Sequence, residues 1–261
     1  LNADNTYPDQ RTKIEYYLAK SLYELGMYHS AQHYFIQVVR KGPANPYFKY
    51  ALPRLIDIAN RTGNDTELLR IVKAIPPEAF PRQAKNHLYY LMGRKFYESD
   101  ELADSAGYFR QISAKSELYM RSKYFEGIIH NERGKLKSAV MAFREVMTAT
   151  PAPAHDARAA QEAEDLKDLA LMNVARVYFG LERFENADNY YAMVDRESTY
   201  WPESLFERAW TNFWRQDLNL TLGLLLTVES PYFSESEYIP EITVLRALTF
   251  FNLCEYDEVE R

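Results

Sequence analysis

The chain has 261 residues, of which 47% are hydrophobic and 15% aromatic, and its formal net charge is −6. This composition excludes a disordered chain, and the few glycines and the lack of alternating Val/Thr-rich runs disfavour a sheet protein. The acidic balance disfavours non-specific binding to nucleic acid or anionic lipid. We therefore expect an all-α protein that forms one or two domains or an elongated array.

Cysteine content and hydropathy exclude further structural features. Cys254 is the only cysteine, so the chain can form neither an intrachain disulfide nor a cysteine-based zinc site. No run of residues reaches the apolar length of a membrane span. The sequence starts without Met and stops in "CEYDEVER", which reads as the beginning of a helix, so we expect the native protein to continue.

Residues 1–11 read as an N-terminal extension, and the first helical pattern follows. An apolar stripe is interrupted by a glycine, and a second stripe then shows a small residue, an aromatic, a branched residue and a closing proline. These marks are, in order, Leu18, Ala19 and Leu22, then Gly26, then Ala31, Phe35, Val38 and Pro43. The glycine turns the chain, the small residue permits close helix contact, the aromatic fills the gap, and the proline separates this hairpin from the next.

The small, aromatic and branched marks of the second stripe return along the chain. They are Leu68, Val72 and Ile75; Ser105, Phe109 and Ile112; Ala139, Phe143 and Val146; Ala187, Tyr191 and Val194; Thr221, Leu225 and Val228; and a last copy that breaks off at Val259. An upstream stripe precedes most copies, as in Met92, Gly93 and Phe96, in Val174, Ala175 and Tyr178, in Ala209, and in Ala247 with Phe250.

The spacing of the small-residue marks sets the repeat length. It is 34 residues from Ser105 to Ala139, 34 from Ala187 to Thr221, and 38 from Thr221 to Val259. Self-similarity at this period is typical of stacked helix-turn-helix units. The longer interval from Ala139 to Ala187 indicates an insertion near 148–165, which we interpret as an overlong first helix in the fifth unit, capped by Asp156. Its tip is either an extra contact edge or a tolerated surface insertion.

These marks resemble those of the tetratricopeptide repeat (TPR) family over residues 12–261. The resemblance implies an α-solenoid of about seven units, the last incomplete, that stack into a right-handed superhelix with a concave groove. Pro53 departs from the pattern, because it falls where the first helix of the second unit should run. We expect that helix to begin late or to kink.

In this family the first helix of each unit lines the concave face, so its outward residues can be compared as columns. The first half of the chain gives an aromatic and basic ladder, and the second half is more apolar. We predict that a partner contacts Tyr16, Lys20, Tyr23, Tyr50, Arg54, Tyr90, Arg94, Tyr97, Tyr124, Arg176, Phe206 and Trp210. Such a ladder suits a protein or peptide with acidic and with aromatic or aliphatic anchors.

An alternative reading assigns the same residues to packing. The aromatics can pack between successive first helices, and the arginines can pair internally with Glu24, Asp57 or Glu98. The cluster of Phe206, Trp210, Phe213 and Trp214 can equally form a core with the seventh unit.

Motifs for catalysis or cofactor binding are missing from the sequence. His29 and His33 are spaced as a metal-binding pair, but no third ligand lies nearby in sequence. There is no G-x-S-x-G, phosphate loop or dinucleotide fingerprint. We expect no catalytic residue, no metal and no cofactor.

The sequence therefore predicts a non-catalytic scaffold or adaptor that binds a protein partner in its groove. The alternative is a docking or regulatory module of a larger enzyme that continues beyond residue 261, whereas nucleic-acid binding would need a longer basic track. Tyr-rich first helices with "A-x-x-x-F-x-x-V" units look similar to bacterial cell-envelope members of the family, which implies a periplasmic or envelope location without membrane insertion; a cytoplasmic location remains the alternative. The partner and the oligomeric state are left open.

Overall fold

The computed structural model describes residues 8–150, 157–230, 233 and 239–259, and these residues form fourteen α-helices, one 3-10 helix and no strand. The expected all-α class is confirmed. The α-helices are α1 (Pro8–Glu24), α2 (Tyr28–Arg40), α3 (Phe48–Thr62), α4 (Thr66–Val72), α5 (Lys85–Glu98), α6 (Leu102–Phe109), α7 (Tyr119–Glu132), α8 (Leu136–Thr148), α9 (Ala157–Gly180), α10 (Phe184–Tyr191), α11 (Trp201–Trp214), α12 (Leu218–Val228), α13 (Ile239–Asn252) and α14 (Tyr256–Val259), and the 3-10 helix η1 is Pro77–Ala79.

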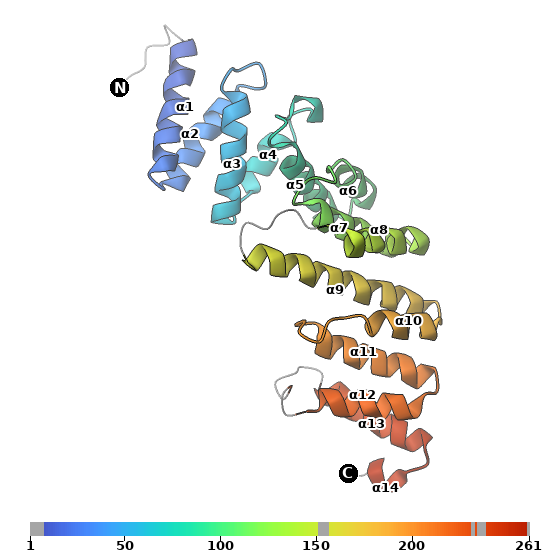
Figure 1. Ribbon diagram of the computed structural model, residues 1–261. Coiled ribbons are helices and arrows are strands. Elements are labelled where there is room, and N and C mark those ends of the chain that lie inside the picture. Colours follow the sequence, from blue (N-terminus) through green and yellow to red (C-terminus); the bar gives the residue numbers. More distant parts are fainter. Residues whose placement is uncertain (1–7, 151–156, 231–232, 234–238, 260–261) are drawn as a thin grey trace. The chain divides into compact units, whose positions relative to one another are not determined.

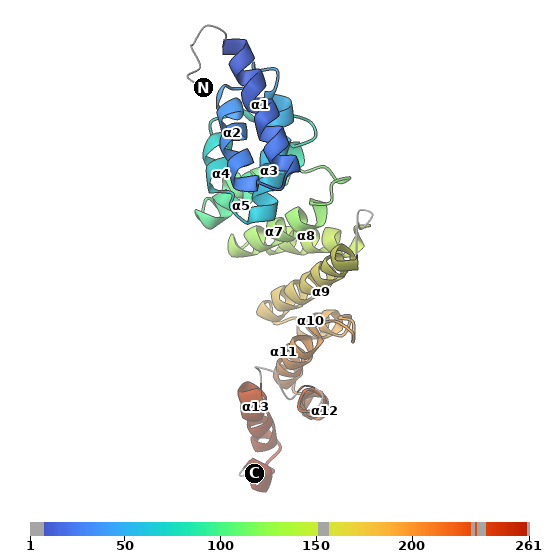
Figure 2. The same ribbon diagram turned by 90° about the vertical axis from the view of Figure 1, so that its left-hand side faces the viewer.

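The chain divides into two compact units, residues 1–119 (unit 1) and residues 120–261 (unit 2). Unit 1 contains the hairpins α1/α2, α3/α4 and α5/α6, and unit 2 contains α7/α8, α9/α10, α11/α12 and α13/α14. Within each unit the second helix of one hairpin packs on the first helix of the next, as α2 does on α3 and α10 on α11. The paired helices can be followed in Figures 1 and 2.

Every hairpin turns through one residue with a left-handed backbone. These residues are Gly26, Gly63, Asp100, Gly134, Glu182, Gln216 and Cys254, with φ between 57° and 68° in six of them and 75° at Gly26. In six hairpins the residue that follows donates its backbone N–H to the carbonyl five residues earlier, as Met27 does to Leu22 at 2.9 Å. This bond satisfies a carbonyl that the helix end would leave unpaired. Glycine adopts the conformation without strain, so its predicted role as the turn residue holds in three hairpins.

The marks read from the sequence form the core. Six copies of the pattern are complete. In five of them the small, aromatic and branched residues are all buried, and in the second copy the corresponding residues Leu68, Val72 and Ile75 are buried as well. Upstream, Ala19, Gly93, Ala175 and Ala209 are also buried. Leu18 departs from this pattern because it lies on the face of α1 that no described helix covers, and it is exposed.

Two of the buried first-helix positions are glycines that touch an aromatic ring of the second helix. A Cβ atom added at Gly93 would lie 2.8 Å from the Phe109 ring, and one added at Gly127 would lie 2.5 Å from the Phe143 ring. Both distances are shorter than a carbon–carbon contact allows. The aromatic mark therefore fills a hole whose floor is the backbone of the facing helix.

Two expectations about individual helices can be checked. Pro53 lies inside α3, which begins at Phe48, so the expected late start is wrong. The helix continues past the proline without the one backbone hydrogen bond that its missing N–H cannot make. In the fifth hairpin, the first helix α9 has 24 residues, whereas α11 has 14. The proposed cap Asp156 lies outside the described residues.

The boundary of the first helix also differs from the sequence reading. α1 begins at Pro8, so it takes up part of the segment 1–11 that was interpreted as an extension. Among the described helices, none combines the length and the apolar character that a membrane crossing requires.

Candidate functional site

Tyrosines from α1, α3 and the loop before α3 form one aromatic patch on unit 1. The Tyr16 ring stacks on the Tyr47 ring, with centroids 4.9 Å apart and planes 24° from parallel. Tyr50 lies 6.3 Å from Tyr16 and is 51% exposed. Tyr17, also exposed, packs edge-on against Tyr16 at 5.4 Å. Burial raises the pKa of the Tyr16 hydroxyl, which therefore stays neutral and available for hydrogen bonding.

Charged groups lie beside this patch, one helical turn further along. The Arg54 guanidinium sits over the Tyr23 ring, 4.5 Å from its centroid, and 3.7 Å from the Glu24 carboxylate. The Tyr23 hydroxyl donates a short hydrogen bond to Asp57, and Arg61 Nε donates another to the same carboxylate at 2.7 Å. Lys20 is exposed.

The pKa values of this group follow from those bonds. The hydrogen bond to Asp57 raises the pKa of Tyr23, and burial adds to the effect. Burial acts to raise the pKa of Asp57, but the hydrogen bonds from Tyr23 and Arg61 outweigh it and hold the pKa below its ordinary value. Asp57 is therefore ionised and bonded to groups of its own chain. Arg54 pairs loosely with Glu24 and also interacts with Tyr23 and with the charge of Asp57.

This arrangement can bind a carboxylate next to a hydrophobic group. Arg54 is held by stacking on Tyr23 rather than by a close ion pair, so an incoming carboxylate can replace Glu24 at little cost. The exposed tyrosine rings offer flat, amphipathic contact area with little side-chain entropy to lose.

The third first-helix of unit 1, α5, carries three more of the predicted residues. The Tyr90 ring lies 5.7 Å from Phe109, which anchors it to α6. Arg94 is exposed and pairs with Glu98 at 3.3 Å, one of the internal pairs that the packing alternative named. Tyr97 is half-buried at the end of the same helix.

In unit 2 the predicted residues are tied into the fold. Tyr124 is half-buried and accepts a hydrogen bond from Asn173 at 3.0 Å. Arg176 makes bonds of 2.5–3.1 Å to Glu207 and one of 2.7 Å to Glu203, both on α11. Burial acts to lower the pKa of Arg176, but the two carboxylates outweigh it and hold the pKa above its ordinary value. This arginine is therefore committed to an internal network.

The two remaining predicted residues, Phe206 and Trp210, lie in or against the core of unit 2. Phe206 is 8% exposed and lies in the cluster formed by α11, α12 and α13, so little of its surface could meet a partner. Trp210 packs partly buried against the same cluster, as does Phe213, whereas Trp214 is exposed. The packing alternative thus describes Phe206 and much of Trp210.

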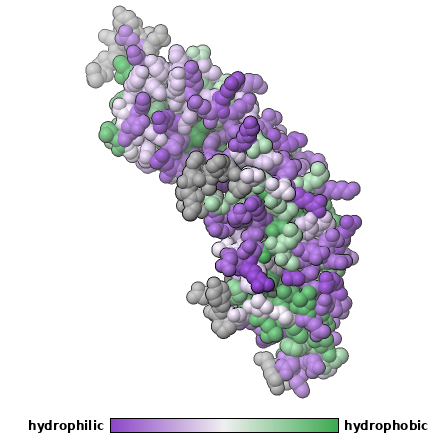
Figure 3. Space-filling model, viewed as in Figure 1, coloured by the Kyte–Doolittle hydropathy of each residue, from purple (hydrophilic) through white to green (hydrophobic). Residues whose placement is uncertain are grey.

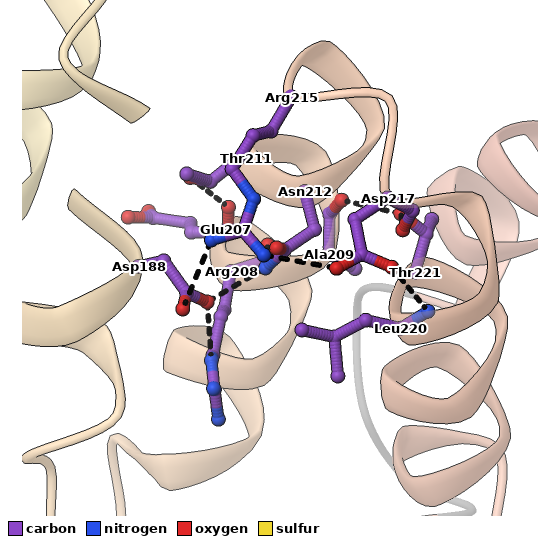
Figure 4. Close-up of polar contacts among 10 residues, drawn as sticks. All are labelled: Asp188, Glu207, Arg208, Ala209, Thr211, Asn212, Arg215, Asp217, Leu220 and Thr221. Carbon is purple, nitrogen blue, oxygen red and sulfur yellow. Dashed lines mark hydrogen bonds and ion pairs between the residues drawn. The ribbon is translucent and has the colours of Figure 1, made fainter. Parts of the chain in front are cut away.

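A second polar network in unit 2 joins α10 to α11 (Figure 4). The buried Asp188 carboxylate accepts hydrogen bonds from Arg208 Nε and Asn212 Nδ2, both at 2.7 Å, and lies 3.7 Å from Arg215. Asp217 accepts from the Leu220 backbone N–H at 3.2 Å and so caps α12. The bonds to Asp188 fix one hairpin on the next, which indicates a structural role.

Sequence reasoning missed two parts of these networks. Tyr47 lies in a loop, outside any helical column, and no periodic signal marks it. Glu203 and Glu207 lie 27 and 31 residues after Arg176, on the neighbouring first helix. A search for acidic residues on the next first helix at less than one repeat length from the arginine would have found them.

The described residues include no group of three histidine, cysteine, aspartate or glutamate side chains that could hold a metal ion. His29 and His33 are both exposed on α2.

Comparison with known proteins identifies the fold. No protein-family profile matches the sequence, and no curated protein matches it. Among solved structures, a tetratricopeptide repeat protein from Parabacteroides merdae matches with a TM-score of 0.52 and 16% identity over 96% of this chain and 90% of that one. PilW, a widely conserved type IV pilus biogenesis factor, matches with a TM-score of 0.53 and 13% identity over 89% and 98%. At such identities the likeness concerns architecture alone. The chain has a tetratricopeptide repeat-like α-solenoid fold.

Proposed function

We propose that the protein is a non-catalytic interaction scaffold, and that unit 1 binds a partner segment along its first helices. The partner places an aromatic or aliphatic side chain on Tyr16 and Tyr50 and a carboxylate beside Arg54 and Lys20. Tyr90, Arg94 and Tyr97 on α5 extend the same set of first-helix positions. Extended surfaces of helical repeats commonly bind other proteins, and this fold supports that general assignment.

The observation that carries the proposal is the exposure of Tyr50 beside a loosely paired arginine. A tyrosine ring with half its surface in water gains most when a partner covers it. The 3.7 Å separation of Arg54 from Glu24 is at the long end for an ion pair, and an exposed pair of this kind contributes about 0–1 kcal/mol. Both groups can therefore change partners without disturbing the hairpin.

A peptide selection tests this assignment. Peptides selected from a random displayed library against the whole chain should converge on a carboxylate a few residues from an aromatic or aliphatic residue. A Tyr50→Ala, Arg54→Glu double variant should then bind the selected peptide at least about tenfold more weakly, the equivalent of roughly 1.4 kcal/mol. Met141→Ala, an exposed change on α8, is the matched control.

Equal binding by the double variant and the wild type would refute the assignment to unit 1. Selected peptides without acidic residues would refute the charge part of the proposal and leave the aromatic part standing.

We further propose a location in the bacterial cell envelope. Two observations support it: the resemblance of the tyrosine-rich repeats to envelope members of the repeat family, and the fold shared with a pilus biogenesis factor. Fractionation of cells that carry a tagged copy of the native gene tests it directly. Recovery with the cytoplasmic fraction would contradict this location without affecting the binding proposal.

A further inference from the structure

An exposed tryptophan on α11 occupies a position that the repeat keeps in solvent. Trp214 lies two residues before the left-handed turn residue Gln216 and is 54% exposed. The residues at the same offset in the other six hairpins are exposed as well; they are Glu24, Arg61, Glu98, Glu132, Gly180 and Asn252. The place of Trp214 in its hairpin therefore accounts for its exposure, and it is the only large hydrophobic residue among these seven.

Two more aromatic rings of α11 join this residue in one surface, the Trp face, which consists of Trp210, Phe213 and Trp214. The Phe213 ring stands nearly perpendicular to both indoles, with centroids 5.9 Å from Trp210 and 6.3 Å from Trp214. Trp210 and Phe213 pack partly buried against the core of unit 2, so Trp214 rests on a fixed support. Hydrophobic side chains gather beside hydrophilic ones over the C-terminal helices in the space-filling view (Figure 3). A supported and exposed indole is typical of the residues that dominate protein interfaces.

Two carboxylates lie on the same face of α11 as the two indoles. Spacings of four, three and four residues place these side chains in one stripe along the helix, and the stripe consists of Glu203, Glu207, Trp210 and Trp214. Both glutamates bind the same cation, Arg176, at 2.7 Å and 2.5 Å, and their side chains are 26% and 23% exposed. One guanidinium thus faces two carboxylates, which leaves a negative charge on the stripe.

The surroundings of the Trp face add to this negative charge. The nearby arginines are themselves paired, Arg208 with Asp188 at 2.7 Å and Arg215 with Asp217 at 2.9 Å. Glu241, which has the same offset on α13 as Glu203 has on α11, is exposed. Unit 2 as a whole contains 15 lysine and arginine against 24 aspartate and glutamate residues, a net charge of −9. This charge attracts a cationic partner and disfavours an anionic one.

Elsewhere in the chain, cations of the protein itself lie over aromatic rings. The Arg54 guanidinium lies 4.5 Å from the centroid of the Tyr23 ring, and the Arg144 guanidinium lies 6.0 Å from that of Tyr190. Among the described residues, no lysine or arginine takes such a place over Trp214. Indole attracts cations more strongly than the other aromatic side chains do. The ring is therefore available to a cation from another molecule.

We propose that the Trp face binds a basic segment of a protein partner, with an arginine or lysine side chain over the Trp214 ring. The charge of that side chain is attracted by the carboxylates of α11 and α13, and an apolar neighbour in the segment covers the rest of the face. This surface is chemically opposite to the one proposed for unit 1, which takes an acidic segment, and it does not depend on that function.

The expected contact is weak, so a titration suits it better than a selection for tight binders. A cation over an exposed indole contributes about twofold to fivefold in affinity. The probe is a fluorescently labelled octapeptide with two arginines and two leucines among glycines. In a second probe citrulline replaces both arginines, which removes the charge and keeps the shape of the side chain.

Fluorescence anisotropy of each probe, titrated with the whole chain, measures the affinity. Trp214→Ala removes the ring and Trp214→Phe keeps a ring that attracts cations less strongly. Met141→Ala, at a residue of α8 that is 66% exposed, is the control. Both sites are exposed, so circular dichroism should show the same helix content in every variant.

The two probes should respond differently to the loss of the ring. Trp214→Ala should weaken binding of the arginine probe by about threefold or more and binding of the citrulline probe by less than about twofold. Trp214→Phe should lie between the wild type and Trp214→Ala, and the control should match the wild type. Comparing both probes on both chains isolates the contact between the cation and the ring.

Three results would overturn the proposal. If Trp214→Ala binds the arginine probe as well as the wild type does, the attraction is a general one to an acidic unit. Equal losses for the two probes would mean an apolar occupant instead of a cationic one. Loss of the arginine probe in Tyr50→Ala would place it on unit 1, whereas unchanged binding by that variant supports the Trp face and leaves the proposal for unit 1 to its own test.

Discussion

Units 1 and 2 have the same hairpin geometry but differ in how deeply their polar side chains are buried. Both turn through left-handed residues and both bury the small, aromatic and branched marks. Unit 2 also buries three carboxylates, Glu126, Asp168 and Asp188, whereas the described part of unit 1 buries none. An arginine of a first helix is loosely paired with a carboxylate in unit 1, as Arg54, and firmly paired in unit 2, as Arg176.

The contrast shows which positions the fold constrains. Close packing fixes the size of the buried residues, so they repeat from hairpin to hairpin. The polar side chains of the first helices meet no such constraint, so they can either join hairpins or bind a partner. Unit 2 joins α9 to α11 through Arg176 and its two carboxylates. Unit 1 joins α1 to α3 through Tyr23 and Asp57 but leaves Tyr50 and Lys20 exposed.

The largest expected effect comes from reversing the firmly paired arginine. Arg176→Glu would place a third carboxylate beside Glu203 and Glu207, so it should destabilise unit 2 by about 2 to 3 kcal/mol, allowing for partial exposure. Arg54→Glu, the same change at the loosely paired arginine of unit 1, should cost less than about 1 kcal/mol.

Two probes separate the units in that experiment. All three tryptophans, Trp201, Trp210 and Trp214, lie in unit 2, so tryptophan fluorescence follows its unfolding in urea, while circular dichroism follows both units. Equal losses of stability in the two variants would mean that the arginines do not differ in the way their contacts indicate.

A smaller effect is expected where the two units pack alike. Gly127→Ala forces a methyl group into the Phe143 ring and should destabilise the α7/α8 hairpin by about 1 to 3 kcal/mol. Gly223→Ala within α12 is the control, because nothing lies within 4 Å of the added Cβ and alanine favours the helix by about 1 kcal/mol. Urea unfolding followed by tryptophan fluorescence should therefore shift in opposite directions, and a stabilising Gly127→Ala would contradict the packing described.

The smallest expected effect concerns a buried carboxyl of unit 2. Burial raises the pKa of Asp168, and Asp195 and Glu164 act in the same direction against hydrogen bonds from Ser198 and the Asp195 backbone. A carboxyl with a higher pKa in the folded chain costs stability as the pH rises from its unfolded pKa through its folded one.

Asp168→Asn removes that cost and keeps an acceptor for both hydrogen bonds. It should therefore raise the free energy of unfolding at neutral pH, and its advantage over the wild type should shrink as the pH falls towards the ordinary pKa of aspartate. Urea unfolding at a series of pH values measures this difference. An advantage that is independent of pH would mean that ionisation of Asp168 does not cause it.

The sequence predicted the hairpins because their marks are dictated by packing. Ala31, Phe35 and Val38 recur in kind since only such sizes fit between two helices and their neighbours. The candidate site was predicted in part: Tyr16, Tyr23, Tyr50 and Arg54 do come together on α1 and α3. The columns placed Arg54 beside Arg176, but α3 is shifted by three residues: Asp57 shares the offset of Arg176 from its hairpin turn. The columns could not show that Glu203 and Glu207 of another helix pair with Arg176. Nor could they reveal Tyr47, which reaches Tyr16 from a loop.

Hydrogen exchange with and without a selected acidic-aromatic peptide tests the central claim most directly. If unit 1 is the binding unit, bound peptide should slow amide exchange in 8–24 and 48–62 and leave 157–180 and 201–214 unchanged. Slower exchange confined to the two helices of unit 2 would contradict the account, because it would assign binding to the arginine that its own glutamates already hold.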